Sequence, residues 1–462
     1  MLKRFFVNKD KIFILILLLF AFPLFTQCQS SNITLQNPKD ERIFKHPSWS
    51  VNTTIYEVNV RQYTPEGTFK AFSSSLPKLK EMGIGILWFM PINPIGVLNR
   101  KGSLGSYYSV QDYTAVNPEF GTLEDFKSVV KQAHDLDMHV IIDWVANHTS
   151  WDNIWTKTHP DFFTKDRNGK FVSPVADWSD VIDLNYDNKE LWNYMRDAMK
   201  FWIKDCNIDG FRCDVAEMVP LGFWKWVRPQ LDSIKTVFML AEGSLPELHQ
   251  AFDMTYNWRL KDLFVDCAKG NKSATDFYEY FSKEKFEYPF DSYRMVFTSN
   301  HDENTWQGTD RERFGDAAET FAILSCVVPG MPLIYSGQEA GLSKRLNFFE
   351  KDLINWDSNV MRNYYSLLLN AKNENKALWN GADGGALQKL SVNDGNVFAF
   401  IREKDNNKVI SIFNLSKEEK QFTIISSKLN GSYKNLFTDH FETLTSQYQL
   451  TLGPWGYRIL IK

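Results

Sequence analysis

Residues 189–215 read KELWNYMRDAMKFWIKDCNIDGFRCDV and place one amphipathic segment directly before one short apolar run. The spacing of apolar residues predicts a helix over 189–205, and the run 210–215 predicts a strand. Arg212 and Asp214 lie two positions apart on this strand, so their side chains share one face. Charged groups are costly to bury unless they are paired or used in function. Residues 189–215 therefore predict one helix followed by one strand, and the charged residues at the end of that strand are either functional or ion-paired.

The same alternation continues on both sides of this unit. Helical patterns cover residues 123–136, 223–231 and 316–327, among others. Eight strands alternating with helices are typical of a (β/α)₈ barrel of the TIM type, an α/β fold. The predicted strands are residues 54–60, 84–89, 139–145, 210–215, 237–241, 251–256, 295–299 and 332–335.

Two regions depart from this rhythm. Residues 147–187 contain no convincing helix, and so long a connection is usually functional. We interpret it as a small excursion after the third strand that walls the active site. Short strands separated by turn residues follow the barrel and predict a C-terminal antiparallel β-sandwich over 385–462. The catalytic barrel is then residues 49–375.

The N-terminus predicts an export signal. Basic residues within 1–11 precede an apolar run over 12–25, which is shorter than the roughly 20 residues that span a bilayer. Cys28 follows this run and resembles the lipobox cysteine of bacterial lipoproteins, although an unmodified cysteine near an ordinary cleavage site is the alternative. We expect residues 1–28 to be the signal and 29–48 a tether. The chain would be exported to the periplasm or cell envelope and would touch the membrane only through a lipid on Cys28.

Composition narrows the function classes. The chain has 462 residues, 44% hydrophobic and 23% charged, with a net charge of -4. These values exclude a disordered chain and a multi-span membrane protein. Because no basic run occurs beyond the N-terminus, we expect no nucleic-acid partner. Four further cysteines show no metal-binding spacing, so buried free thiols are expected, with a disulfide left open by export. They are Cys206, Cys213, Cys267 and Cys326.

Polar residues close several of the predicted strands. In a TIM barrel the catalytic groups lie at the C-terminal ends of strands. Asp214, Glu242 and Asp302 end the fourth, fifth and seventh strands. Carboxyl groups gathered at one barrel mouth fit retaining glycoside hydrolysis, which needs a nucleophile and a general acid. A structural ion pair between Arg212 and Asp214 is the alternative for that pair.

These strand ends resemble the short conserved regions of the α-amylase family. The resemblance also includes 105–113 (GSYYSVQDY) and 329–339 (PGMPLIYSGQE), and it covers nearly the whole mature chain. It implies that Asp214 is the nucleophile, Glu242 the general acid/base and Asp302 the carboxylate that stabilises the transition state. It also implies that Arg212 orients Asp214, and that His148 and His301 hydrogen-bond the sugar. Tyr108 would stack beneath that sugar, and Asp143 would have a supporting role rather than a chemical one.

The resemblance further implies an α-glucan or maltooligosaccharide substrate and a possible structural calcium ion. Asn147 and Asp183 match two of its oxygen ligands, whereas calcium takes six to eight. Glu217 and Met218 stand where many endo-acting members carry Lys-His, and residues 214–216 are closer to neopullulanase-like and cyclomaltodextrin-cleaving members. Short oligosaccharides and bonds other than internal α-1,4 links therefore stay open. A transglycosylase and a non-catalytic surface glycan-binding protein are the alternatives.

Overall fold

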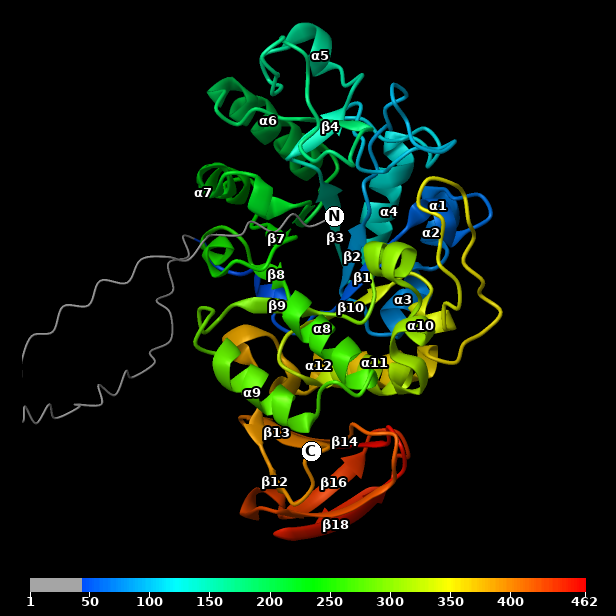
Figure 1. Cartoon of the computed structure of the whole chain (residues 1–462), viewed down its shortest axis with the longest axis vertical. Coiled ribbons are helices and arrows are strands. Elements are labelled where there is room, and N and C mark those ends of the chain that lie inside the picture. The colour runs from blue at the N-terminus through cyan, green and yellow to red at the C-terminus, as the bar shows by residue number, and fades with distance from the viewer. Residues whose placement is uncertain (1–43) are drawn as a thin grey trace, which may run out of the picture. The chain divides into compact units, whose positions relative to one another are not determined.

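The computed structural model describes residues 44–462, so the predicted signal peptide, Cys28 and most of the predicted tether lie outside the described residues. Eight parallel strands close into a barrel in the order β1-β10-β9-β8-β7-β6-β3-β2, which confirms the predicted fold (Figure 1). All eight predicted strands are present. They are β1 (Ile55–Val58), β2 (Ile86–Phe89), β3 (His139–Trp144), β6 (Gly210–Cys213), β7 (Phe238–Ala241), β8 (Met254–Tyr256), β9 (Tyr293–Val296) and β10 (Met331–Tyr335).

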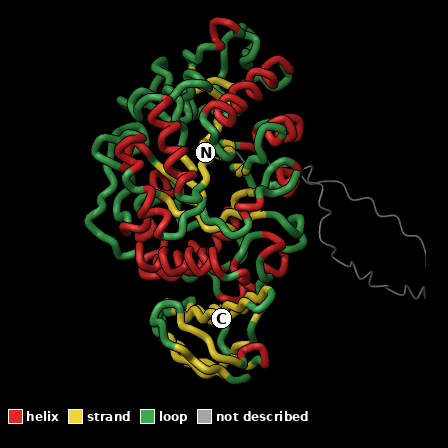
Figure 2. The backbone as a smooth tube through the Cα atoms, turned by 180° about the vertical axis from the view of Figure 1, so that it is seen from behind, coloured by secondary structure: helices red, strands yellow, loops and turns green. Residues whose placement is uncertain are grey.

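Helices surround the barrel strands (Figure 2). A capping box begins α4, because Asp125 N donates to Thr122 Oγ1 at 3.1 Å while Thr122 N donates to Asp125 Oδ2 at 2.8 Å. The helices are α1 (Val60–Tyr63), α2 (Phe69–Ser73), α3 (Leu76–Glu81), α4 (Leu123–Asp135), α6 (Lys189–Asp205), α7 (Leu221–Asp232), α8 (Trp258–Ala268), α9 (Ala274–Glu284), α10 (Asp310–Phe314), α11 (Ala318–Val327) and α12 (Arg362–Glu374).

The barrel interior changes character along the strands. Ile55, Ile141 and Leu240 belong to one buried apolar cluster inside the barrel. Two residues after Ile55 and Ile141, on the same faces, stand Glu57 and Asp143, which are also buried. The lower part of the barrel is therefore a packed apolar core, and the carboxyl ends of the strands gather polar groups that this core holds in place.

Residues 44–48, which we assigned to the tether, contact the barrel. The guanidinium of Arg228 lies 3.7 Å from the ring centroid of Phe44. His46 Nδ1 lies 2.7 Å from Asp253 Oδ1, just before β8. Because Asp253 and Arg228 are buried, this segment packs as part of the catalytic domain.

The excursion after β3 contains a small hairpin. Strands β4 (His148–Ser150) and β5 (Val181–Asp183) pair antiparallel, with His148 opposite Asp183. One helical turn, α5 (Trp155–Thr158), lies between them, where we predicted no helix. The hairpin therefore carries His148 from the end of β3 to the barrel mouth.

The C-terminal region forms two antiparallel sheets, ordered β11-β13-β14-β19-β16-β17 and β12-β15-β18, as predicted for a sandwich. The sequence analysis did not mark β16, β17 and β18, because polar residues interrupt the apolar ones in each of these strands. The strands are β11 (Gln388–Lys389), β12 (Ser391–Val392), β13 (Val397–Lys404), β14 (Asn407–Asn414), β15 (Lys420–Ile425), β16 (Gly431–Asn435), β17 (Phe441–Leu444), β18 (Gln447–Leu452) and β19 (Tyr457–Ile461).

Two further expectations concern residues 44–462. Cys206, Cys213, Cys267 and Cys326 are buried free thiols, so the disulfide alternative does not hold for them. No helix in this part of the chain combines the length and apolar character that crossing a membrane requires.

Candidate active site

One buried guanidinium group holds together carboxyl groups from three strands. Arg212 Nη1 donates to Asp143 Oδ1 at 2.9 Å and to Asp214 Oδ1 at 2.8 Å. Its Nη2 lies 3.0 Å from Glu242 Oε2. Arg212 Nε donates to the hydroxyl of Tyr256 at 3.1 Å. Asp214 and Glu242 are therefore close neighbours, as a retaining mechanism requires of a nucleophile and its acid.

The backbone after β6 completes this half of the site. Val215 has a φ of 35°, a left-handed conformation that a β-branched residue rarely adopts. Its N–H donates to Glu242 Oε2 at 2.7 Å, directly beside Asp214. Strained backbone of this kind is concentrated at functional sites. The turn fixes Glu242 relative to Asp214 without using another side chain.

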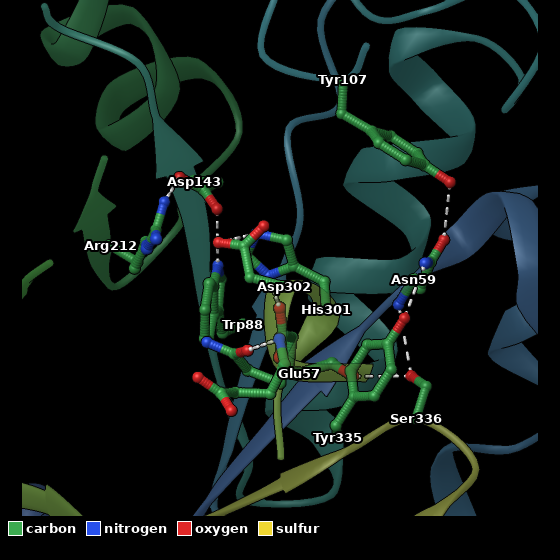
Figure 3. A network of polar contacts seen from close by, with 12 residues as sticks. Glu57, Asn59, Trp88, Tyr107, Asp143, Arg212, His301, Asp302, Tyr335 and Ser336 are labelled. Carbon is green, nitrogen blue, oxygen red and sulfur yellow. Dashed lines mark hydrogen bonds and ion pairs between the residues drawn. The ribbon is translucent and has the colours of Figure 1, made fainter. Parts of the chain in front are cut away.

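A second set of contacts is centred on His301 (Figure 3). Its Nδ1 lies 2.5 Å from Glu57 Oε1, and its Nε2 lies 2.9 Å from the hydroxyl of Tyr108 and 3.3 Å from Asp302 Oδ2. The Tyr108 hydroxyl donates to Asp143 Oδ2 at 3.0 Å. The network therefore connects Asp302 to the carboxyl groups around Arg212.

Burial and mutual charge set the ionisation of the Arg212 cluster. Burial raises the pKa of Asp214, and the nearby Glu242 carboxylate raises it further, while Arg212 opposes both effects. Burial likewise raises the pKa of Asp143 to about 6, again opposed by Arg212. Carboxyl groups this close titrate as a unit. Burial and the neighbouring carboxylate thus hold the pKa of Asp214 above its usual range, and Arg212 is the group that favours its ionised form.

The histidines at the mouth differ in charge. Burial alone would lower the pKa of His301, but the carboxylates of Asp302 and Glu57 raise it well above its usual value. Burial would raise the pKa of Asp302, yet His301 lowers it overall. Burial lowers the pKa of His148 to about 3, which leaves a neutral ring with its Nε2 3.8 Å from Asp214 Oδ2. His301 and Asp302 therefore form an ion pair, and His148 is a neutral hydrogen-bonding group.

The candidate calcium ligands lie beside this site. Asn147 precedes His148, and His148 pairs with Asp183 across the hairpin. Burial raises the pKa of the Asp183 carboxyl, which makes no ion pair with the cationic side chains of residues 44–462. Within the same residues, no three His, Cys, Asp or Glu side chains group as metal ligands do. Asn147 and Asp183 thus offer two side-chain oxygens, and the remaining ligands would have to be backbone carbonyls or water.

The structure brings together every side chain that the sequence analysis placed at the barrel mouth. It also adds residues that the analysis did not single out. Glu57 stands in β1 and bonds His301. The indole N–H of Trp306 donates to Asp302 Oδ1 at 3.1 Å. A carboxylate inside an apolar strand was a usable signal for Glu57, whereas nothing in the sequence marked Trp306.

Three carboxyl groups close to one arginine, at the carboxyl ends of the strands of a (β/α)₈ barrel, define a class: a glycoside hydrolase with a retaining site. Comparison with known sequences then gives the family. The model described as "Alpha amylase, catalytic domain" matches residues 25–385, and the model described as "Maltogenic Amylase, C-terminal domain" matches residues 387–459. The chain belongs to the α-amylase family.

Individual proteins resemble most of the chain. A noncanonic maltogenic α-amylase from Thermotoga neapolitana shares 31% identity, with 89% of this chain and 98% of that chain covered and a TM-score of 0.81. Alpha-amylase 3 of Dictyoglomus thermophilum is 25% identical over 88% of this chain and 93% of its own. An α-1,4-glucan:maltose-1-phosphate maltosyltransferase of Picrophilus torridus is 25% identical over 91% of this chain and 70% of its own.

Proposed function

We propose that this enzyme hydrolyses α-glucosidic bonds, mainly α-1,4, of starch-derived glucans or maltooligosaccharides with retention of configuration. Membership of the α-amylase family supports this class of reaction. The single observation that carries the residue roles is the grouping of Asp214 and Glu242 around one guanidinium group, with Asp302 joined to the same network through His301 and Tyr108.

The chemistry follows from this arrangement. Glu242 gives its proton to the glycosidic oxygen while Asp214 attacks the anomeric carbon, so the sugar–oxygen bond breaks as a glucosyl–enzyme ester forms. Glu242, now ionised, takes a proton from water, and the water oxygen displaces Asp214 and regenerates both groups. Asp302 binds sugar hydroxyls and stabilises the positive charge that develops in each transition state. Arg212 orients Asp214 and favours its ionised form.

The acceptor side supports a preference for short substrates. Glu217 stands where many family members carry lysine, and its carboxylate instead accepts the N–H groups of Ser244 and Leu245. Met218 and Leu245 are 46% and 43% exposed beside it. The region after Asp214 therefore lacks the lysine and histidine that bind sugar there in many endo-acting relatives, and we infer that maltooligosaccharides are cleaved better than long starch chains.

Transfer to a sugar acceptor is the second candidate. The similarity to a maltosyltransferase favours it, and the same three acids serve both reactions. The two reactions differ only in whether water or a sugar hydroxyl resolves the ester. Product chains longer than the substrate at high oligosaccharide concentration would identify transfer.

Export, lipidation and calcium are further parts of the proposal. The charge and hydropathy of residues 1–28 support export, and Cys28 supports a lipid anchor in the cell envelope. The mass of the mature N-terminus would test both. For calcium, support comes from Asp183, a half-buried carboxylate that has no ion-pair partner within residues 44–462 and lies opposite His148, the residue that follows Asn147.

The experiment that tests the reaction compares the mature enzyme with an Asp214→Asn variant on maltoheptaose, pullulan and β-cyclodextrin. We expect products from the unmodified enzyme alone, with a loss of at least about 10⁴-fold in the variant, and α-anomers as first products by NMR. The substrate that is cleaved fastest identifies the bond and the mode. Binding of all three without products from either protein would overturn the proposal and leave a glycan-binding protein.

A further inference from the structure

A large aromatic side chain stands at the barrel mouth, next to the most exposed of the three acids. The carboxylate of Asp302 is 40% exposed, against 9% for Asp214 and 15% for Glu242. Four residues further on, Trp306 is 51% exposed, and its indole N–H donates to Asp302 Oδ1 at 3.1 Å. His301 lies at the other oxygen, Oδ2. Asp302 is thus held between an imidazolium and an indole.

The backbone that carries Trp306 is firmly anchored. Residues Glu303–Gln307 form one turn of π-helix, a feature frequent at functional sites. Asn304 Oδ1 accepts from Leu346 N at 2.9 Å, and Thr305 Oγ1 donates to Leu346 O at 3.0 Å. The carboxylate of Glu303 lies 2.9 Å from Lys261 and 3.0 Å from Arg313. The exposure of the Trp306 ring is therefore a fixed feature and does not arise from a loose surface loop.

The aromatic neighbours of Trp306 extend toward the sugar-binding residues. Its ring centroid lies 5.6 Å from that of Phe348 and 6.1 Å from that of Phe349. Phe348 in turn is stacked with Tyr108, at 6.2 Å and 11° between ring planes. Aromatic rings with one polar tip pair naturally with sugars, whose C–H faces are apolar and whose rims are hydroxylated.

From these contacts we propose that Trp306 has two roles: it positions Asp302 through the indole N–H, and its ring is a stacking surface for a glucosyl unit adjacent to the one being cleaved. This rests on the proposed function, because it takes Asp302 to be the carboxylate that stabilises the transition state. It adds a specificity-determining residue that lies outside the three acids and their histidine and arginine partners.

The two roles can be separated by substitution. Trp306→Phe keeps an aromatic face and removes the N–H, whereas Trp306→Ala removes both. The hydrogen bond from Trp306 favours the ionised form of Asp302, so its loss raises the pKa of Asp302 and moves the acidic limb of the kcat/KM profile to higher pH. The other titratable or charged groups that act on Asp302 or are acted on by it stay in place in both variants: His301, Arg212, Glu57, Tyr108 and Tyr335.

The measurement is kcat, KM and the pH profile on maltoheptaose. We expect Trp306→Phe to lower kcat about tenfold with KM changed less than about twofold. We expect Trp306→Ala to show the same loss in kcat and an increase in KM of about tenfold. Phe441→Ala is the matched control, because Phe441 is 74% exposed in the C-terminal sheet, and it should behave as the unmodified enzyme. Thermal melts of all variants should coincide, since neither aromatic ring is buried.

A binding arm separates this inference from the proposed function. In the Asp214→Asn background, calorimetry with maltoheptaose should show Kd raised about tenfold by Trp306→Ala and nearly unchanged by Trp306→Phe. Unmodified kinetics and binding in both Trp306 variants would overturn the inference while hydrolysis by the parent enzyme stands. Absence of hydrolysis by the parent enzyme would overturn the proposed function, and the binding arm would then decide the stacking role alone.

Discussion

At the scale of single residues, Arg212 governs the site. It is fully buried and contacts Asp143, Asp214 and Glu242 at 2.9, 2.8 and 3.0 Å. A planar guanidinium presents five N–H donors in a rigid fork, whereas a lysine ammonium presents three donors at the end of a flexible stem. Its positive charge is also the main influence that opposes the rise in pKa of the buried carboxyls. One side chain therefore sets both the geometry and the ionisation of the acids.

Replacing Arg212 tests this dual role. We expect Arg212→Met to lower the free energy of unfolding by about 3–5 kcal/mol at neutral pH, because Asp143 would stay buried without its cation. The pKa values of Asp143 and Asp214 would rise further, so the acidic limb of kcat/KM would move to higher pH. Urea denaturation and pH–rate profiles would measure both. Arg212→Lys keeps the charge and loses the planar set of N–H donors. Its free energy of unfolding and its pH–rate profile should lie between those of the unmodified enzyme and Arg212→Met. An unmodified pH–rate profile in Arg212→Lys would contradict the argument from geometry.

At the scale of elements, the hairpin of β4 and β5 connects the excursion to the acids. It carries His148, whose neutral ring faces Asp214, and it ends at Asp183. A half-buried carboxylate with a raised pKa is stabilised by any cation that binds beside it. The hairpin is therefore the element where a bound ion would influence both stability and the position of His148.

A calcium titration tests this element. We expect millimolar CaCl2 to raise Tm by roughly 2–5 °C relative to EGTA, since an ion that binds only the folded state stabilises it. Asp183→Asn should abolish the response, because it removes the charged ligand. Asp187→Asn, an exposed aspartate close by in the chain, should keep the response. Equal melting curves with and without calcium in the unmodified protein would remove calcium from the proposal.

At the scale of the whole molecule, Arg402 connects the C-terminal sheets to the barrel through hydrogen bonds. This buried side chain of β13 donates from Nη1 to the carbonyls of Val327 and Val328 at 3.1 and 2.9 Å, at the end of α11. Its Nε donates to Gly385 O at 2.8 Å. Burial lowers the pKa of Arg402 to about 9. Aromatic packing adds to this contact: the ring centroid of Phe277 in α9 lies 5.3 Å from that of Phe398 in β13.

Replacing Arg402 should lower the stability of the folded chain without changing the catalysed reaction. We expect Arg402→Met to cost about 3–5 kcal/mol in the free energy of unfolding, because several buried carbonyls would lose their donor. The kcat of the folded enzyme at low temperature should remain unchanged, since the acids lie at the carboxyl ends of the strands, away from this contact. Lys434→Met, at a 41% exposed lysine, is the control for loss of one positive charge. Unfolding of the sheets at a lower denaturant concentration than the barrel would show that the two parts are not one cooperative unit.

The sequence by itself predicted the barrel, its eight strands and the acids that follow three of them. Each of these predictions depends on a short stretch of sequence. A short apolar run predicts a strand, and the polar residue that ends the run is predicted to lie at the barrel mouth. Strands that lack an apolar run, such as β17 and β18, could not be predicted in this way, because polar residues interrupt their apolar ones.

Only the tertiary structure decided which distant residues support those acids. Glu57 bonds His301 across 244 positions of sequence, and Arg212 reaches Asp143 across 69. The left-handed turn at Val215 and the exposed indole of Trp306 likewise depend on neighbours brought together by closure of the barrel. Burial and electrostatic coupling are properties of these non-local contacts, and no local pattern of residues encodes them.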